Sequence, residues 1–145
     1  MYLEKALIIY DTASGNTRII AERIKKRLED LGMSVDLFRD KEFKAFTSVG
    51  DYQIIALGAP RHGNWPAFTL TRKLKPLLKM DLKGKKLITF ASAGGPRHQQ
   101  ICQKIENFIK PTGIIPVTSI GCVGKPTEDF DMVLGAALQE KMFQR

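Results

Sequence analysis

Small polar side chains fill the segment that follows the first apolar run of the chain. Residues 6–10 are all apolar and predict a buried strand, and a helical pattern resumes at about residue 15. The connection carries three hydroxyls, one amide and one glycine, from Thr12, Ser14, Thr17, Asn16 and Gly15. Because a helix N-terminus presents backbone N–H groups and the positive end of the helix dipole, this loop is suited to holding an anion.

The motifs that are missing narrow the choice of anion. The sequence has neither a GxGxxG dinucleotide motif nor a GxxxxGK[ST] triphosphate motif, and the loop has no lysine to neutralise a polyphosphate. Of the anions considered, a monophosphate held by neutral donors and the helix dipole is the one that this loop fits best. The alternative is an ordinary N-terminal cap in which a hydroxyl binds its own helix, although a simple cap needs only one such residue.

Strand and helix patterns alternate along the rest of the chain. Strands are expected near residues 5–10, 33–40, 52–60, 85–95 and 114–123. Helices are expected from about residue 15 to a cap at Gly32, from Pro66 through Leu78, over Ile101 to Ile109, and from about Glu128. Pro116 cannot donate to a sheet and places the last strand at an edge. The pattern predicts an α/β fold, a doubly wound five-stranded parallel sheet with helices on both faces.

In such folds the binding crevice lies outside the carboxyl ends of the strands. The segments expected there are "DTASGNT" (11–17), "GAPRHGNWP" (58–66) and "SAGGPRHQ" (92–99). All three are rich in small residues, which allow a ligand to approach the backbone closely.

These segments resemble those of the flavodoxin family. The pattern [ST]-x-[ST]-G-N-T at residues 12–17 is similar to the family's FMN phosphate loop, and residues 51–66 and 85–95 resemble its two flavin loops with their strands. The resemblance covers nearly the whole chain and fits the short-chain type. It implies a flavodoxin-like sheet of strand order 2-1-3-4-5 and a protein that binds FMN and carries single electrons between redox partners.

The resemblance also implies which residues bind the cofactor. The phosphate would be held by Thr12, Ala13, Ser14, Gly15, Asn16 and Thr17. The isoalloxazine would be bordered on one side by Ala59, Pro60, Arg61, His62, Gly63, Asn64 and Trp65, and at its pyrimidine end by Ser92, Ala93, Gly94 and Gly95. Trp65 either stacks on the flavin or packs at the start of the next helix. His62 and His98 either contact the flavin or face solvent.

Length and composition limit the number of domains and the class of protein. The 145 residues predict one domain, 1–145, and a hydrophobic content of 43% with 26% charged residues is typical of a globular chain rather than a membrane or disordered one. The N-terminus does not resemble a signal peptide, so a cytoplasmic protein is expected. Cys102 and Cys122 are expected to be buried, reduced thiols, and the spacing of the two histidines predicts no metal site.

The net charge of +8 departs from the acidic surface common among flavodoxins. The basic residues are scattered and lack the patterns of nucleic-acid-binding modules, so no nucleic acid is expected as a partner. The charge indicates either a solvated basic surface or an acidic redox partner, such as a ferredoxin-like protein or a reductase. A monomer or weak dimer is expected.

Other functions stay open at this level. An FMN-dependent reductase of a quinone or similar molecule would need a substrate pocket, for which the chain is short unless a dimer supplies a second wall. A second alternative is a dedicated partner protein of one redox enzyme, like the flavodoxin-like activators that serve ribonucleotide reductase. An electron carrier is favoured over a catalyst with its own substrate, and no residue is assigned a catalytic role. A receiver-type signalling domain is set aside because only Asp11 is counted among aspartates at strand ends.

Overall fold

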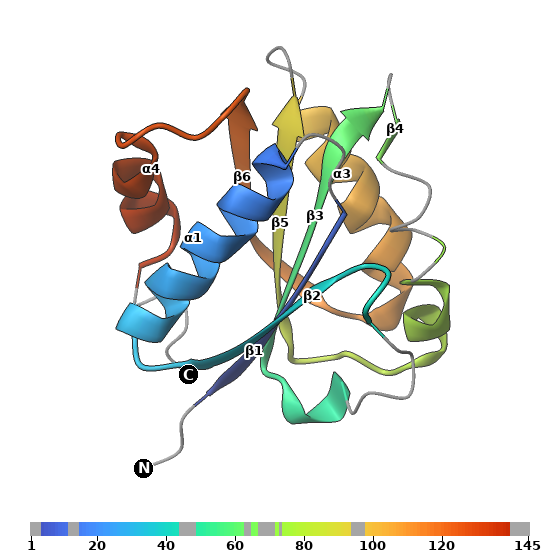
Figure 1. Cartoon of the computed structure of the whole chain (residues 1–145). Helices are drawn as coiled ribbons and strands as arrows, with labels where there is room; N and C mark the ends of the chain where they lie inside the picture. The colour runs from blue at the N-terminus through green and yellow to red at the C-terminus, as the bar shows by residue number, and fades with distance from the viewer. Residues whose placement is uncertain are drawn as a thin grey trace.

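The protein is a parallel sheet between two layers of helices (Figure 1). The computed structural model describes residues 4–11, 15–43, 49–62, 65–66, 72, 74–93 and 98–139. The strands are β1 (Lys5–Tyr10), β2 (Ser34–Arg39), β3 (Ile54–His62), β4 (Trp65–Pro66), β5 (Lys86–Ala93) and β6 (Ile115–Val123). The helices are α1 (Asn16–Asp30), α3 (His98–Ile109) and α4 (Phe130–Ala137), with 3₁₀ turns η1 (Val49–Asp51), η2 (Lys75–Lys79) and η3 (Lys110–Thr112).

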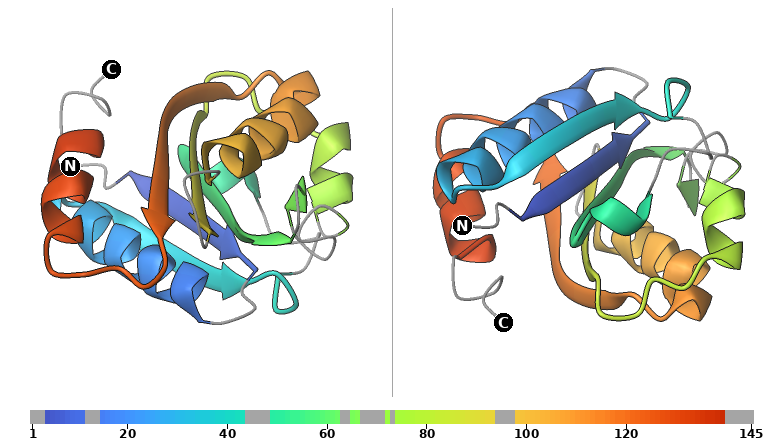
Figure 2. Two further views of the ribbon diagram at one scale, coloured as in Figure 1. Left: turned by 90° about the horizontal axis from the view of Figure 1, so that it is seen from above. Right: turned by 90° about the horizontal axis from the view of Figure 1, so that it is seen from below.

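The main sheet has the order β2-β1-β3-β5-β6, and every neighbouring pair in it is parallel. Counted without the short β4, this is the predicted order 2-1-3-4-5, so the predicted fold class is confirmed. The strand that carries Pro116 lies at a sheet edge, as a residue without an N–H donor requires. Figure 2 shows α1 and α4 on one face of the sheet and α3 on the other.

The central strands are apolar throughout because both of their faces are covered. In β1, Leu7 and Ile9 belong to the core beneath α3, while Ala6, Ile8 and Tyr10 belong to the core beneath α1 and α4. The unbroken apolar run at the start of the sequence is therefore buried on both sides.

Helix α1 follows the predicted pattern closely. Its stripe of Ile20, Ile24 and Leu28 is fully buried against the sheet. The helix ends at Asp30, and Gly32 follows just beyond its last turn with a φ of +91°, which is accessible to glycine at little cost. The Met33 N–H donates to Leu28 O at 3.1 Å, which closes the C-terminal turn. The sequence thus places both ends of this helix.

The predicted helix that begins at Pro66 is wrong at its start. Pro66 lies in β4, where it pairs antiparallel with Arg61, and Trp65 pairs with His62. Only two residues separate the paired positions His62 and Trp65, and two-residue connections that contain glycine favour hairpins. Farther along, Leu74 and Leu77 are buried as predicted, and η2, with proline in its first turn, occupies residues 75–79.

Candidate functional site

Helix α1 begins at the carboxyl edge of the sheet with a glycine. Gly15 is its N-cap, with a φ of +92°, and the Ile19 N–H donates to Gly15 O at 3.2 Å as the first bond of the helix. The N–H groups of Asn16, Thr17 and Arg18 therefore have no acceptor within the helix. The cap residue is a glycine and so offers no side chain of its own to cap the helix. The first turn also has no acidic residue to occupy the positive end of the dipole.

Thr17 connects this helix end to the end of β5. Its Oγ1 lies 2.8 Å from Ser92 Oγ, across 75 residues of sequence. Thr17 is fully buried and Ser92 is 5% exposed. Two residues that the sequence assigns to different cofactor loops are thus in direct contact.

The end of β3 lies beside the end of β5 at the carboxyl edge of the sheet. Pro60 pairs with Ser92, and Ala59, fully buried, pairs with Ala91. The Asp11 N–H donates to Gly58 O at 3.0 Å, which holds the start of the loop after β1 against β3. The structure therefore brings together segments from all three predicted loops: Gly15 to Thr17, Ala59 to Pro60, and Ser92.

The remaining predicted residues are seen only in part. Thr12, Ala13, Ser14, Gly63, Asn64, Gly94 and Gly95 lie outside the described residues, and Arg61, His62, Trp65, Ala93 and His98 are described by backbone alone. Trp65 lies in β4 rather than at the start of a helix. Contact of Trp65, His62 or His98 with a flavin stays a prediction.

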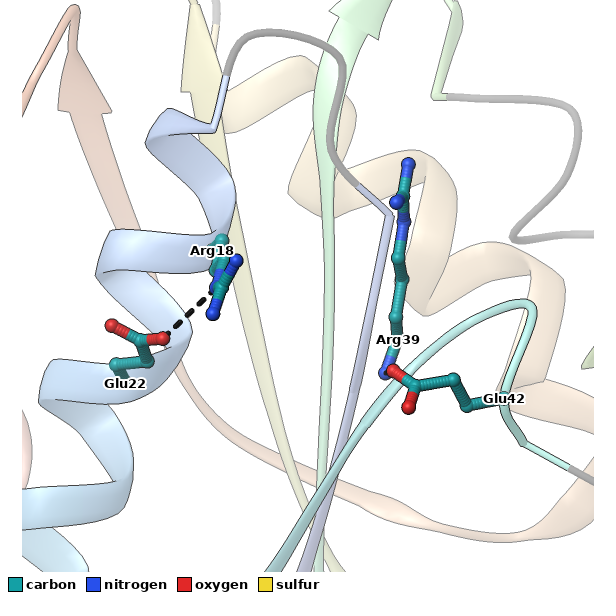
Figure 3. Close-up of polar contacts among 4 residues, drawn as sticks. All are labelled: Arg18, Glu22, Arg39 and Glu42. Carbon is teal, nitrogen blue, oxygen red and sulfur yellow. Dashed lines mark hydrogen bonds and ion pairs between the residues drawn. The ribbon is translucent and has the colours of Figure 1, made fainter.

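Two arginines and two glutamates act on the pKa of Tyr10, at the end of β1. Figure 3 shows these four side chains, Arg18 and Glu22 on α1 and Arg39 and Glu42 at and after the end of β2. Burial raises the pKa of Tyr10, the positive charges of Arg18 and Arg39 lower it, and the charges of Glu42 and Glu22 raise it. Arg18 is tied to Glu22 in an ion pair of 3.0 Å, with both side chains at least half exposed. Arg18 and Glu22 therefore balance each other at this end of the helix.

Asp40 is a strand-end residue that the sequence reasoning missed. It follows β2, is fully buried, donates its N–H to Tyr10 O at 2.6 Å and accepts from the Lys41 N–H at 2.8 Å through Oδ1. The count of Asp11 alone at strand ends is thus wrong, and the signal was the position of Asp40 at the end of a predicted strand. Within the described part of the chain, no three His, Cys, Asp or Glu residues are placed to hold a metal ion.

Both cysteines are free thiols. Cys102 is buried as predicted, and burial raises its pKa to about 11. Cys122 is only half-buried, which differs from the prediction, and burial raises its pKa as well. Neither thiol is activated as a nucleophile, because both favour the protonated form.

A doubly wound parallel sheet with a helix starting at its carboxyl edge belongs to the class of open α/β domains that bind ligands beyond the carboxyl ends of their strands. The family model for flavodoxin matches residues 8–134. A flavodoxin of Maridesulfovibrio salexigens is 25% identical over 97% of this chain and 100% of its own length.

Solved structures show the same fold. Oxidised Flavodoxin 1 from Bacillus cereus superposes with a TM-score of 0.85 at 18% identity, over 98% of this chain and 100% of that one. Rubredoxin oxygen:oxidoreductase from Desulfovibrio gigas gives a TM-score of 0.83 at 19% identity over 92% of this chain, which spans only 34% of that protein.

The chain belongs to the flavodoxin family. It is an FMN-binding electron-transfer protein, and the predictions of family, cofactor and function are confirmed. None of the helices in the described segments is long and apolar enough to cross a membrane. The cytoplasmic location and the monomeric or weakly dimeric state stay predictions.

Proposed function

We propose that FMN binds at the sheet edge formed by the start of α1 and the ends of β3 and β5. The observation that carries this proposal is the glycine-capped start of α1, held beside the end of β5 by the Thr17–Ser92 contact. FMN supplies the one-electron chemistry when it is bound. Residues Thr12 to Thr17 hold its phosphate, the loop from Ala59 to Trp65 borders the ring on one side, and Ser92 to Gly95 border its pyrimidine end.

The donor set fits a phosphate monoester. The backbone N–H groups of Asn16 to Arg18 have no acceptor within α1, and Asn16 and Thr17 add an amide and a hydroxyl. The nearest cation in sequence, Arg18, pairs with Glu22 instead. The charge of the phosphate is therefore met by neutral donors and the helix dipole, as the sequence pattern indicates.

The first prediction concerns the phosphate. We expect the protein to bind one FMN per chain and to bind riboflavin at least about 100-fold more weakly, because hydrogen bonds to an ionised group contribute about 1.5–3 kcal/mol each. Quenching of flavin fluorescence during titration of the apoprotein measures both affinities. If the folded protein shows no saturable FMN binding, the proposed site is wrong. If riboflavin binds equally well, the phosphate loop is wrong while the flavin site remains.

We infer that its redox partner presents an acidic surface to the flavin edge. The support is the net charge of +8. Arg18 in the first turn of α1 is exposed but paired with Glu22, so reversing its charge changes the net charge of this edge rather than removing a free cation. Long-range attraction between opposite net charges raises encounter rates and is screened by salt.

The second prediction follows from that charge. Electron transfer with an acidic ferredoxin-type protein is expected to slow as ionic strength rises, and Arg18→Glu is expected to slow it further at low salt. Lys26→Glu is the matched control, since it makes the same charge change on the same helix about 12 Å farther along the axis. Stopped-flow rates over a salt series measure both. Equal slowing by the two variants would place the partner away from the flavin edge, and a rate independent of salt would remove the electrostatic explanation.

A further inference from the structure

Thr17 and Ser92 form a hydroxyl pair enclosed between α1 and β5. Their oxygens are 2.8 Å apart, Thr17 is fully buried, and Ser92 is 5% exposed. Ser92 is held from both sides of β5, because it pairs with Pro60 in β3 and with Cys122 in β6. The backbone of Ser92 is therefore fixed by the sheet.

The number of protons limits what this pair can do. Each hydroxyl carries one proton and two lone pairs, and the single hydrogen bond between them uses one proton. If Ser92 donates, the Thr17 proton is free to point elsewhere. If Thr17 donates, the free proton belongs to Ser92. The two arrangements differ in which residue can donate to a ligand.

We propose that Ser92 is a positioning residue that donates to Thr17 Oγ1 and so leaves the Thr17 proton for the phosphate of FMN. This inference rests on the proposed site, in which Thr17 belongs to the phosphate loop. A negative charge at the start of α1 favours the arrangement in which a proton points toward it, and hydrogen bonds in a chain polarise one another. Ser92 thereby acts on phosphate recognition although it lies at the end of another element, strand β5.

The experiment separates this role from a merely structural one. In Ser92→Ala, Thr17 keeps its proton but loses the partner that polarises it. Strengthening by about 10–30% of a hydrogen bond worth about 1.5–3 kcal/mol corresponds to a fall in FMN affinity of up to about fourfold, whereas riboflavin affinity is expected to stay unchanged. A structural role would weaken both flavins alike. The measured quantity is the ratio of the two dissociation constants, from titrations of the apoprotein.

Control variants are available in the chain. Thr89 Oγ1 and Ser119 Oγ form a similar pair at 2.8 Å between β5 and β6, so Ser119→Ala removes a serine hydroxyl from a comparable pair and is expected to leave both affinities unchanged. The double variant Thr17→Ser/Ser92→Thr keeps both hydroxyls and the total volume, and is expected to restore most of the FMN preference. If Ser92→Ala does not fold, Ser92→Cys is close in size with a weaker donor, and is expected to lower the ratio of FMN to riboflavin affinity by no more than Ser92→Ala would.

The outcomes distinguish this proposal from the one on which it rests. An unchanged ratio of FMN to riboflavin affinity in Ser92→Ala or Ser92→Cys would overturn the role of Ser92 and leave the FMN site intact. No FMN binding by the wild-type protein would overturn both.

Discussion

Alanine at position 58 is expected to destabilise the fold by about 2–3 kcal/mol, because the added methyl group has no space. Gly58 lies in the central strand β3, between its register partners Tyr10 in β1 and Phe90 in β5. A Cβ at this position would stand 2.0 Å from Cε2 of Phe90 and 2.3 Å from its Cζ. The Phe90 ring is fully buried in the core beneath α1 and α4, so it cannot turn outward to make room.

Urea unfolding of the apoprotein measures this loss. Gly50→Ala is the matched control, because the same methyl group there would meet no atom within 4 Å and the backbone φ is not positive. The double variant Gly58→Ala/Phe90→Leu tests the cause, since a smaller side chain at 90 should make the added methyl less costly. Additive losses in the double variant, or full stability of Gly58→Ala, would show that the ring is not what excludes a side chain at 58.

A side chain at position 58 would also disturb the start of the proposed phosphate loop. Gly58 O accepts the hydrogen bond from the Asp11 N–H, directly before the loop that carries Thr12 to Thr17. A shift of β3 away from Phe90 would displace that anchor. Gly58→Ala is therefore expected to weaken FMN binding as well as folding.

Local patterns were enough to predict the elements that position the site. The apolar run from Ala6 to Tyr10 and the stripe of Ile20, Ile24 and Leu28 each reflect a periodicity set by backbone geometry. Gly32 follows the end of α1 at a positive φ, which the sequence indicates because glycine adopts that conformation without strain. Strand order came from the resemblance, since spacing alone does not say which parallel strands are neighbours.

What the sequence did not show depends on contacts between distant segments. The Thr17–Ser92 pair spans 75 residues, and nothing local in either loop indicates it. β4 was missed because Pro66 is common both at helix starts and on edge strands, and only its pairing with Arg61 decides between them. Asp40 was overlooked because the burial of a carboxylate after a strand depends on how neighbouring segments pack around it.

The start of α1 allows one substitution with opposite effects on folding and on binding. Asn16, half-buried, is the first residue of the helix, and the first turn has no acidic side chain. In Asn16→Asp the new carboxylate lies at the positive end of the dipole, so we expect the apoprotein to gain about 0.3–1 kcal/mol of stability. The same charge would oppose a phosphate that carries nearly two negative charges near neutral pH.

The repulsion sets the size of the binding effect. Two unit charges 4 Å apart in water interact by about 1 kcal/mol, so a carboxylate beside a nearly dianionic phosphate costs about 2 kcal/mol, or about 30-fold in FMN affinity. Riboflavin has no phosphate, and its affinity is expected to stay the same. Titration of the apoprotein with each flavin, together with urea unfolding, measures both effects on one variant.

Two further variants separate charge from lost contacts. Asn16→Ala removes the amide without adding charge, so it should weaken FMN binding less than Asn16→Asp does. Asn107→Asp makes the same chemical change near the C-terminal end of α3, where it is exposed; it should leave FMN affinity unchanged and slightly lower stability. Because added salt screens exposed charges, the penalty in Asn16→Asp should shrink as ionic strength rises. If Asn16→Asp binds FMN as tightly as the wild-type protein does, the phosphate does not lie at the start of α1, whatever else the sheet edge holds.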